Sequence, residues 1–118
     1  MTTAKKNLLP CPTCPWRVDQ TAAAIPRYNH EKACGLMRTV GREDDFRPIM
    51  ACHASTETDE RACHGYLARE GWSNLNVRFL LFEGQIANPN DVLRACEEAG
   101  IKLHSTYAEV LEKLEASL

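Results

Sequence analysis

The spacing of apolar residues predicts short amphipathic helices joined by irregular segments. Between residues 30 and 40, apolar side chains recur at positions 33, 36, 37 and 40, which share one face of a helix. Asn29 precedes this segment as a candidate N-cap, and Gly41 follows it as a stop. Residues 1–28 carry three prolines within six positions, so we expect a rigid loop there and no helix.

The middle of the chain carries two further helix signals. A short helix is predicted over residues 65–69. The apolar residues of 75–82 indicate another, with Ser73 or Asn74 as its N-cap and Gly84 at its end.

Two clearer helices are predicted at the end of the chain. Asn90 is the expected N-cap of a helix over residues 91–99, and Gly100 is its expected stop. Thr106 and Glu109 have the spacing of a capping box for the last helix. The predicted inward faces contain Val92, Leu93 and Cys96 in the first of these helices, and Tyr107, Val110, Leu111 and Leu114 in the second.

These elements predict a mainly α, metal-stabilised single domain of residues 1–118, with four to five short helices and irregular loops rich in cysteine and proline. Residues 10–80 form its expected cysteine-rich, metal-binding core, and residues 88–118 its C-terminal helical pair. Between the first two helices we expect a charged connector at 42–45 and a short extended segment at 46–51.

Composition limits the function classes. A chain of 118 residues with 25% charged residues and a mean hydropathy of -0.38 is typical of one soluble domain, and no apolar run approaches the ~20 residues of a membrane helix. The net charge of -2 gives no general attraction to nucleic acid phosphates. No stretch of signal-peptide character opens the chain, so we expect a cytoplasmic protein.

In a reducing compartment, six cysteines indicate metal ligands rather than disulfides. Cys11 and Cys14 form a C-x-x-C motif, whose spacing lets two thiolates reach one metal or cluster. Cys52 and Cys63 are the best further ligands, since they flank a polar loop. The alternative is that these four are separate buried cysteines that pack as small apolar residues.

The other candidate ligands are assigned different roles. His53 and His64 directly follow two of the cysteines, so each is a hydrogen-bonding neighbour of the thiolates or an alternative ligand. Cys34 and Cys96 lie beside apolar residues of predicted helices, so we expect them in the core. Pro15 after Cys14 and the wide spacing of the second pair favour a [4Fe–4S] cluster over a structural zinc ion, which stays the alternative.

A resemblance adds weight to the same four cysteines. The chain contains, in order, Pro10-Cys-Pro-Thr-Cys-Pro-Trp-Arg17, Met50-Ala-Cys-His53, Ala62-Cys-His-Gly-Tyr66 and Asn76-Val-Arg78. Over about residues 10–80 it resembles a family of small, functionally uncharacterised cysteine-rich proteins from bacteriophages, prophages and actinobacteria, whose pattern is CxxCP-aromatic-R, then CH, then C-x-G-aromatic. The resemblance implies a phage or prophage accessory protein and no particular activity.

No catalytic signature is recognisable, so we expect a non-enzymatic protein that binds a host or phage macromolecule, most simply a protein. The candidate partner-binding residues are Trp72, Arg17, Trp16 and Tyr66. For Trp16 and Tyr66, packing against the metal site is the competing explanation. The alternative functions are an iron–sulfur redox or sensor protein and a small nucleic-acid-binding regulator.

Overall fold

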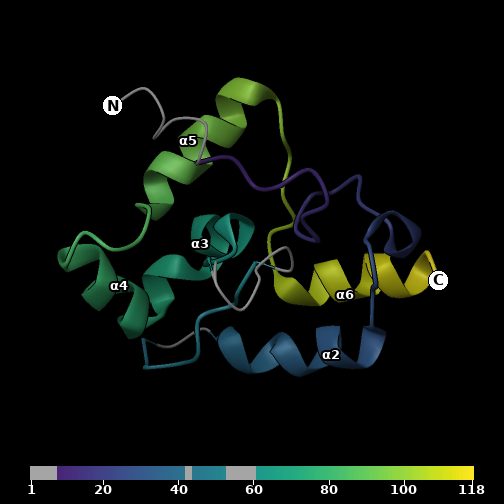
Figure 1. The fold of residues 1–118 in the computed structure, drawn as a ribbon, viewed down its shortest axis with the longest axis horizontal. Coiled ribbons are helices and arrows are strands. Elements are labelled where there is room, and N and C mark those ends of the chain that lie inside the picture. The colour runs from purple at the N-terminus through teal and green to yellow at the C-terminus, as the bar shows by residue number, and fades with distance from the viewer. Residues whose placement is uncertain (1–7, 42–43, 53–60) are drawn as a thin grey trace.

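The computed structural model describes residues 8–41, 44–52 and 61–118. Its helices are α2 (His30–Gly35), α3 (His64–Glu70), α4 (Leu75–Phe82), α5 (Pro89–Ala99) and α6 (Tyr107–Ala116), with 3₁₀ turns at Ala22–Ala24, Leu36–Thr39 and Gly71–Ser73 (Figure 1). Within the described ranges the chain forms isolated bridges and no strand. The predicted mainly α fold of a small single domain is confirmed.

The helix after Asn29 is shorter than its sequence pattern predicts. The Asn29 side chain caps it as expected, accepting a hydrogen bond from the backbone N–H of Lys32 at 3.0 Å. However, α2 gives way to a 3₁₀ turn that ends at Thr39, before Gly41. The Thr39 hydroxyl donates to the Leu36 carbonyl at 2.7 Å, and a side-chain bond of this kind competes with the helical ladder.

The caps of the later helices confirm one prediction and correct another. Asn74, the second of the two expected residues, caps α4. The N-cap of α5 is Asn88, not Asn90 as predicted, because Pro89 fits the first helical position, where no N–H is needed. Gly100 ends α5 in the left-handed conformation, with φ of 74°.

The last helix has the predicted cap with one difference. The Thr106 hydroxyl accepts from the Glu109 N–H at 3.2 Å. The Glu109 carboxylate accepts from the backbone N–H of Ser105 at 3.1 Å, one residue ahead of the position that a capping box uses.

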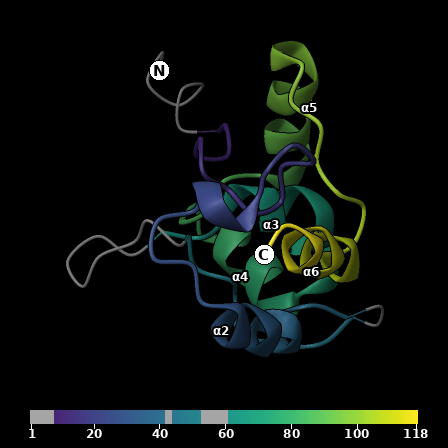
Figure 2. The same cartoon turned by 90° about the vertical axis from the view of Figure 1, so that its right-hand side faces the viewer.

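The core joins the cysteine loops to the helical pair. Trp16 is fully buried and its ring packs against Tyr66 and Tyr107, at centroid distances of 6.5 and 5.5 Å. Its carbonyl accepts from the His104 N–H at 2.9 Å, and Arg17 pairs with Leu103 in an isolated bridge. Figures 1 and 2 show α3 near the centre, with α5 on one side and the neighbouring helices α2 and α6 on the other.

In the described part of the chain, no helix combines the length and the apolar character that crossing a bilayer requires.

Candidate metal centre

The first wall of the site is the loop that carries the C-x-x-C motif. The Cys14 N–H donates to the Cys11 carbonyl at 3.0 Å, which closes a tight turn and brings the two thiols to one side. The Arg17 guanidinium holds this turn by donating to the carbonyls of Cys11 at 2.9 Å and Pro10 at 2.7 Å. Two charge-assisted hydrogen bonds from one planar group fix the loop's orientation.

The second wall is an antiparallel bridge between Ala51 and Ala62. On either side of this bridge, the Cys52 N–H donates to the Arg61 carbonyl at 2.7 Å and the Cys63 N–H donates to the Met50 carbonyl at 2.9 Å. The bridge thus places Cys52 and Cys63 on neighbouring segments of the chain. Sequence reasoning predicted the extended segment but not its pairing.

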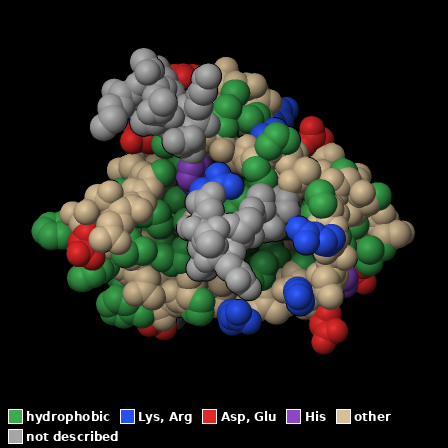
Figure 3. All heavy atoms as spheres, in the orientation of Figure 1, with side chains coloured by type: hydrophobic (Ala, Val, Ile, Leu, Met, Phe, Trp, Pro, Cys, Tyr) green, Lys and Arg blue, Asp and Glu red, His purple; other side chains and the backbone are tan. Residues whose placement is uncertain are grey.

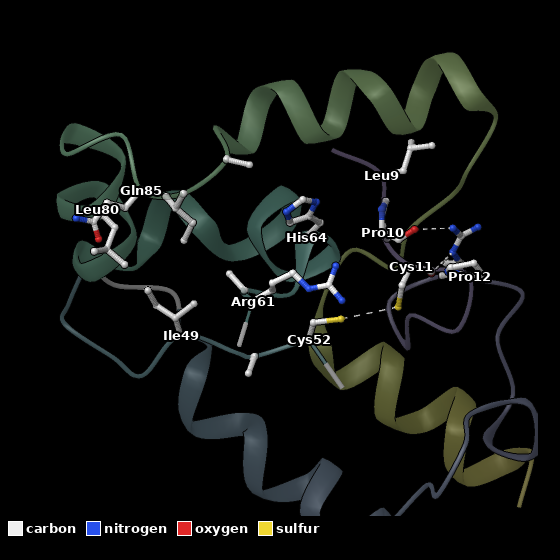
Figure 4. Close-up of a pocket in the computed structure, with 15 residues that line it drawn as sticks. Leu9, Pro10, Cys11, Pro12, Ile49, Cys52, Arg61, His64, Leu80 and Gln85 are labelled. Carbon is white, nitrogen blue, oxygen red and sulfur yellow. Dashed lines mark hydrogen bonds between the residues drawn. The ribbon is translucent and has the colours of Figure 1, made fainter. Parts of the chain in front are cut away.

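The four predicted cysteine ligands come together as two sulfur pairs. The inner pair, Cys14 and Cys63, has its sulfurs 3.8 Å apart, and the side chains are 1% and 5% exposed. The outer pair, Cys11 and Cys52, has its sulfurs 4.0 Å apart (Figure 4), and both residues are half-buried. No disulfide joins any of the six cysteines, all of which lie in the described ranges.

A further interaction links the two pairs. Cys11 forms a hydrogen bond with Cys14 that favours the Cys14 thiolate, but the contact with Cys63 and burial outweigh it, so the pKa of Cys14 lies above its ordinary value. Within the described residues, no group of three or more His, Cys, Asp or Glu side chains is already arranged to hold a metal ion. The structure therefore shows neighbouring thiols and not a completed coordination shell.

Gly65 allows α3 to pack closely against the loop that carries Cys11 and Cys14. A Cβ at this position would lie 2.6 Å from Cβ of Trp16, closer than real contacts allow, and 3.0 Å from the sulfur of Cys14, which is a tight contact. The first turn of α3 thus approaches the cysteine loop only because residue 65 lacks a side chain. The sequence showed Gly65 in its C-H-G-Y motif, but not what it faces.

The two histidines are placed differently. His53 lies outside the described residues. The His64 ring is displaced from the sulfurs toward α5 (Figure 4). Burial lowers the pKa of His64, while hydrogen bonding with the backbone of Leu8 and Leu9 opposes that shift and the charge of Arg61 adds to it. His64 therefore contacts the segment ahead of the cysteine loop, as a neighbour of the centre.

An open groove of about 970 Å³ adjoins the outer pair. Its described lining contains Cys11, Cys52, Arg17, Arg61 and His64 together with apolar side chains, and it contains no Asp or Glu. The inner pair is not among these lining residues. The two cysteine pairs thus differ in solvent access.

The candidate partner-binding residues divide into buried and exposed ones. Trp16 and Tyr66 are both 0% exposed, so burial rules them out as surface contacts and supports the packing explanation. Arg17 is half-buried and bonded to the cysteine loop. Trp72 is 39% exposed, and its indole N–H donates to Asn90 Oδ1 at 3.0 Å.

The remaining cysteines correct one expectation. Cys96 is 1% exposed and packs in the core as predicted. Cys34 was expected there too, but it is exposed, with its sulfur 3.5 Å from His30 Nε2. The short α2 buries only Ala33, so the neighbouring position faces outward.

Sequence reasoning treated Asn74 as a helix cap and missed its larger role. This side chain is 0% exposed, and it donates to the carbonyl of Arg47 at 3.0 Å and to the Tyr66 hydroxyl at 2.9 Å. The Tyr66 hydroxyl in turn donates to the Thr39 carbonyl. This network ties the segment ahead of Cys52 to α3 and α4, and no sequence pattern indicates it.

Comparison with known proteins places the chain in a family without giving it an activity. Neither a search of curated proteins nor a search of solved structures finds a match. A family match extends over residues 6–117, which include all four cysteines of the site and both C-terminal helices. The chain belongs to DUF6283, a family of unknown function.

Proposed function

We propose that this is a cytoplasmic, non-catalytic accessory protein of phage type that binds a host or phage protein. In this proposal a metal centre at Cys11, Cys14, Cys52 and Cys63 fixes the loops of the fold, and an apolar surface makes the contact. The observation that carries the binding role is the exposure of two aromatic residues of α4. Phe79 is 61% exposed and Phe82 is 92% exposed.

We call Phe46, Phe79 and Phe82 the α4 surface. Phe46 is 64% exposed and lies near the start of α4, because Asp45 pairs with Asn74 in a bridge. Figure 3 shows hydrophobic side chains gathered over this part of the molecule. Within α4 only Val77 is buried; the leucines of the helix are half-buried, and Phe79 and Phe82 are exposed.

Exposed aromatic residues of this kind are typical of protein interfaces, where they occupy pockets of the partner. The neighbouring cations are engaged within the chain: Arg78 pairs with Asp44 at 3.0 Å, and Arg47 donates to the Ser73 carbonyl at 3.0 Å. Such a surface suits a protein with an apolar pocket better than a nucleic acid.

The test uses the full chain as bait in a host lysate, followed by reconstitution with the purified partner. The wild type is compared with a Phe79→Ser/Phe82→Ser variant and with Val18→Ser, a control at a residue that is 39% exposed elsewhere. We expect a stoichiometric protein partner whose affinity falls at least tenfold in the double variant and is unchanged in the control. Circular dichroism should show all three proteins folded.

Four outcomes would contradict the proposal. Full affinity in the double variant would show that the α4 surface is not the contact, and nuclease-sensitive capture would indicate a nucleic acid. A dimer of the purified chain that dissociates in the double variant would show that a second copy covers this surface. Substrate turnover that Cys52→Ser abolishes without unfolding would show a catalytic centre.

A further inference from the structure

We infer that the four cysteines hold a single zinc ion in a tetrahedral thiolate site, and not a [4Fe–4S] cluster. This inference rests on the proposed metal centre and names its metal. Four sulfurs at ~2.3 Å from one zinc ion stand about 3.8 Å from one another at the corners of a tetrahedron. The observed contacts of 3.8 Å for the inner pair and 4.0 Å for the outer pair match that edge.

A cluster makes a different demand on the same residues. Each cysteine of a [4Fe–4S] site binds a different iron, so its four sulfurs surround a cube and stand farther apart than sulfurs in direct contact. The inner pair would have to separate to admit such a cube.

Packing around the inner pair opposes that separation. The Cys14 sulfur lies 3.0 Å from the position of a Cβ on Gly65, so the first turn of α3 closes one side of it. Cys63 is the N-cap of α3, and its N–H is bonded to the Met50 carbonyl. Packed backbone therefore holds both cysteines in place. Binding one zinc ion would move them less than binding a cluster would.

The surroundings suit the charge of the site. Four thiolates around Zn²⁺ carry a net charge of -2, which needs nearby donors or cations. Arg17 is bonded to the turn that carries Cys11, and the groove beside the outer pair contains Arg17 and Arg61 but no described carboxylate. Four protein ligands leave no position for water, so the zinc ion has a structural role.

The test begins with the full chain expressed anaerobically with both iron and zinc supplied. Metal analysis and visible absorption should show one zinc ion per chain and a colourless protein. After exchange with Co²⁺, we expect the intense visible absorption of tetrahedral cobalt thiolate, which added zinc should abolish.

The ligands are tested at the outer pair, because its half-buried position makes substitution less harmful to folding. Cys52→Ser should lower zinc affinity at least tenfold and weaken the cobalt absorption. Cys34→Ser is the matched control at an exposed cysteine and should behave as the wild type. A cobalt spectrum in Cys52→Ser identical to that of the wild type would overturn the ligand assignment.

The outcomes separate the two proposals. About four irons with acid-labile sulfide per chain would overturn zinc but leave the four-cysteine centre intact. A folded chain that retains no metal would overturn the zinc inference together with the metal part of the proposed function. The α4 surface is tested independently of either result.

Discussion

The cysteine region and the C-terminal helical pair reach their structures by different means. We define the cysteine region as the described residues of 8–25, 44–52 and 61–66, and the helical pair as residues 88–118. The helical pair is regular: its two helices have side-chain caps at Asn88 and Thr106 and bury one apolar face each. The cysteine region consists of turns, bridges and side-chain bonds to backbone carbonyls.

This difference has an energetic meaning. A capped amphipathic helix gains stability from local bonds and from burial of its own face. An irregular loop must order residues without a repeating ladder, at a cost of about 1–2 kcal/mol per residue in backbone entropy. The cysteine region therefore depends on a few long-range contacts, among which those of the inner sulfur pair and of Trp16 are buried.

The two regions are nevertheless coupled through one core. Trp16 packs on Tyr107 of α6, and the Val18 N–H donates to the Lys102 carbonyl at 3.0 Å. The Tyr107 hydroxyl also donates to the Ala33 carbonyl at 2.7 Å, which connects α6 to α2. Loss of the cysteine region should consequently destabilise the whole domain in one transition.

The largest expected effect is that of breaking the inner pair. Cys63→Ser removes a buried sulfur and one proposed ligand, so we expect unfolding free energy to fall by about 3 kcal/mol or more. Urea denaturation followed by circular dichroism measures this loss, which should appear as a single transition of the whole domain. Cys34→Ser is the control, and stability equal to the wild type in Cys63→Ser would contradict the importance of the inner pair.

A smaller loss is expected from adding one methyl group at Gly65. In Gly65→Ala the new Cβ would overlap Trp16 and press on Cys14, and overpacking of this kind costs about 1–3 kcal/mol. Gly35→Ala is a matched control, since its nearest described neighbour is an Arg38 side-chain nitrogen at 4.0 Å. The test compares the unfolding free energies of the two variants by urea denaturation. Equal values would show that α3 can withdraw from the cysteine loop at no cost.

The same contrast explains how far sequence reasoning reached. Caps and stops are local signals, so Asn29, Asn74, Thr106 and Gly100 were identified from residues within a few positions of each helix end. The start of α5 was misplaced by two residues because two asparagines flank Pro89, and only the first can cap a helix that begins with proline.

The sequence contains no comparable local signal for the long-range packing. The sequence predicted which four cysteines gather, from the C-x-x-C spacing and the family pattern, but it did not show that they form an inner and an outer pair. The close approach at Gly65 and the buried network of Asn74 depend on segments many residues apart. The exposure of Phe79 and Phe82 was likewise missed, because apolar residues at helical spacing predict a buried face.

The corrected N-cap of α5 gives a prediction confined to the helical pair. Asn88→Ala removes the side-chain oxygen that accepts from the Asn90 N–H at 2.8 Å, so we expect a loss of about 1 kcal/mol. Asn90→Ala removes only the bond to the Trp72 indole on the surface, and should cost less. Thermal or urea denaturation of the two variants tests whether Asn88 is the N-cap of α5. A larger loss of stability in Asn90→Ala would show that Asn90 is the cap, as the sequence predicted.

The smallest effect is a pH dependence where the two regions meet, at His104. Burial lowers the pKa of His104, the nearby Glu109 carboxylate opposes the shift, and Lys113 adds to it. Its Nε2 is buried and has no hydrogen-bond partner among the described residues, so the folded protein favours the neutral ring. The unfolded chain takes up this proton near pH 6.5, before the folded chain does, so stability is lost as the pH falls below that value.

We therefore expect the wild type to lose more unfolding free energy between pH 7.5 and 5.5 than His104→Gln, which cannot titrate. Both proteins keep the same cysteines, so the acid sensitivity of the metal centre affects them equally and cancels in the difference. Urea denaturation at the two pH values provides the comparison, and an NMR titration of His104 gives its pKa directly. A folded-state pKa at or above 6.5, or identical pH dependence in the two proteins, would show that burial of the His104 ring imposes no penalty on its charged form.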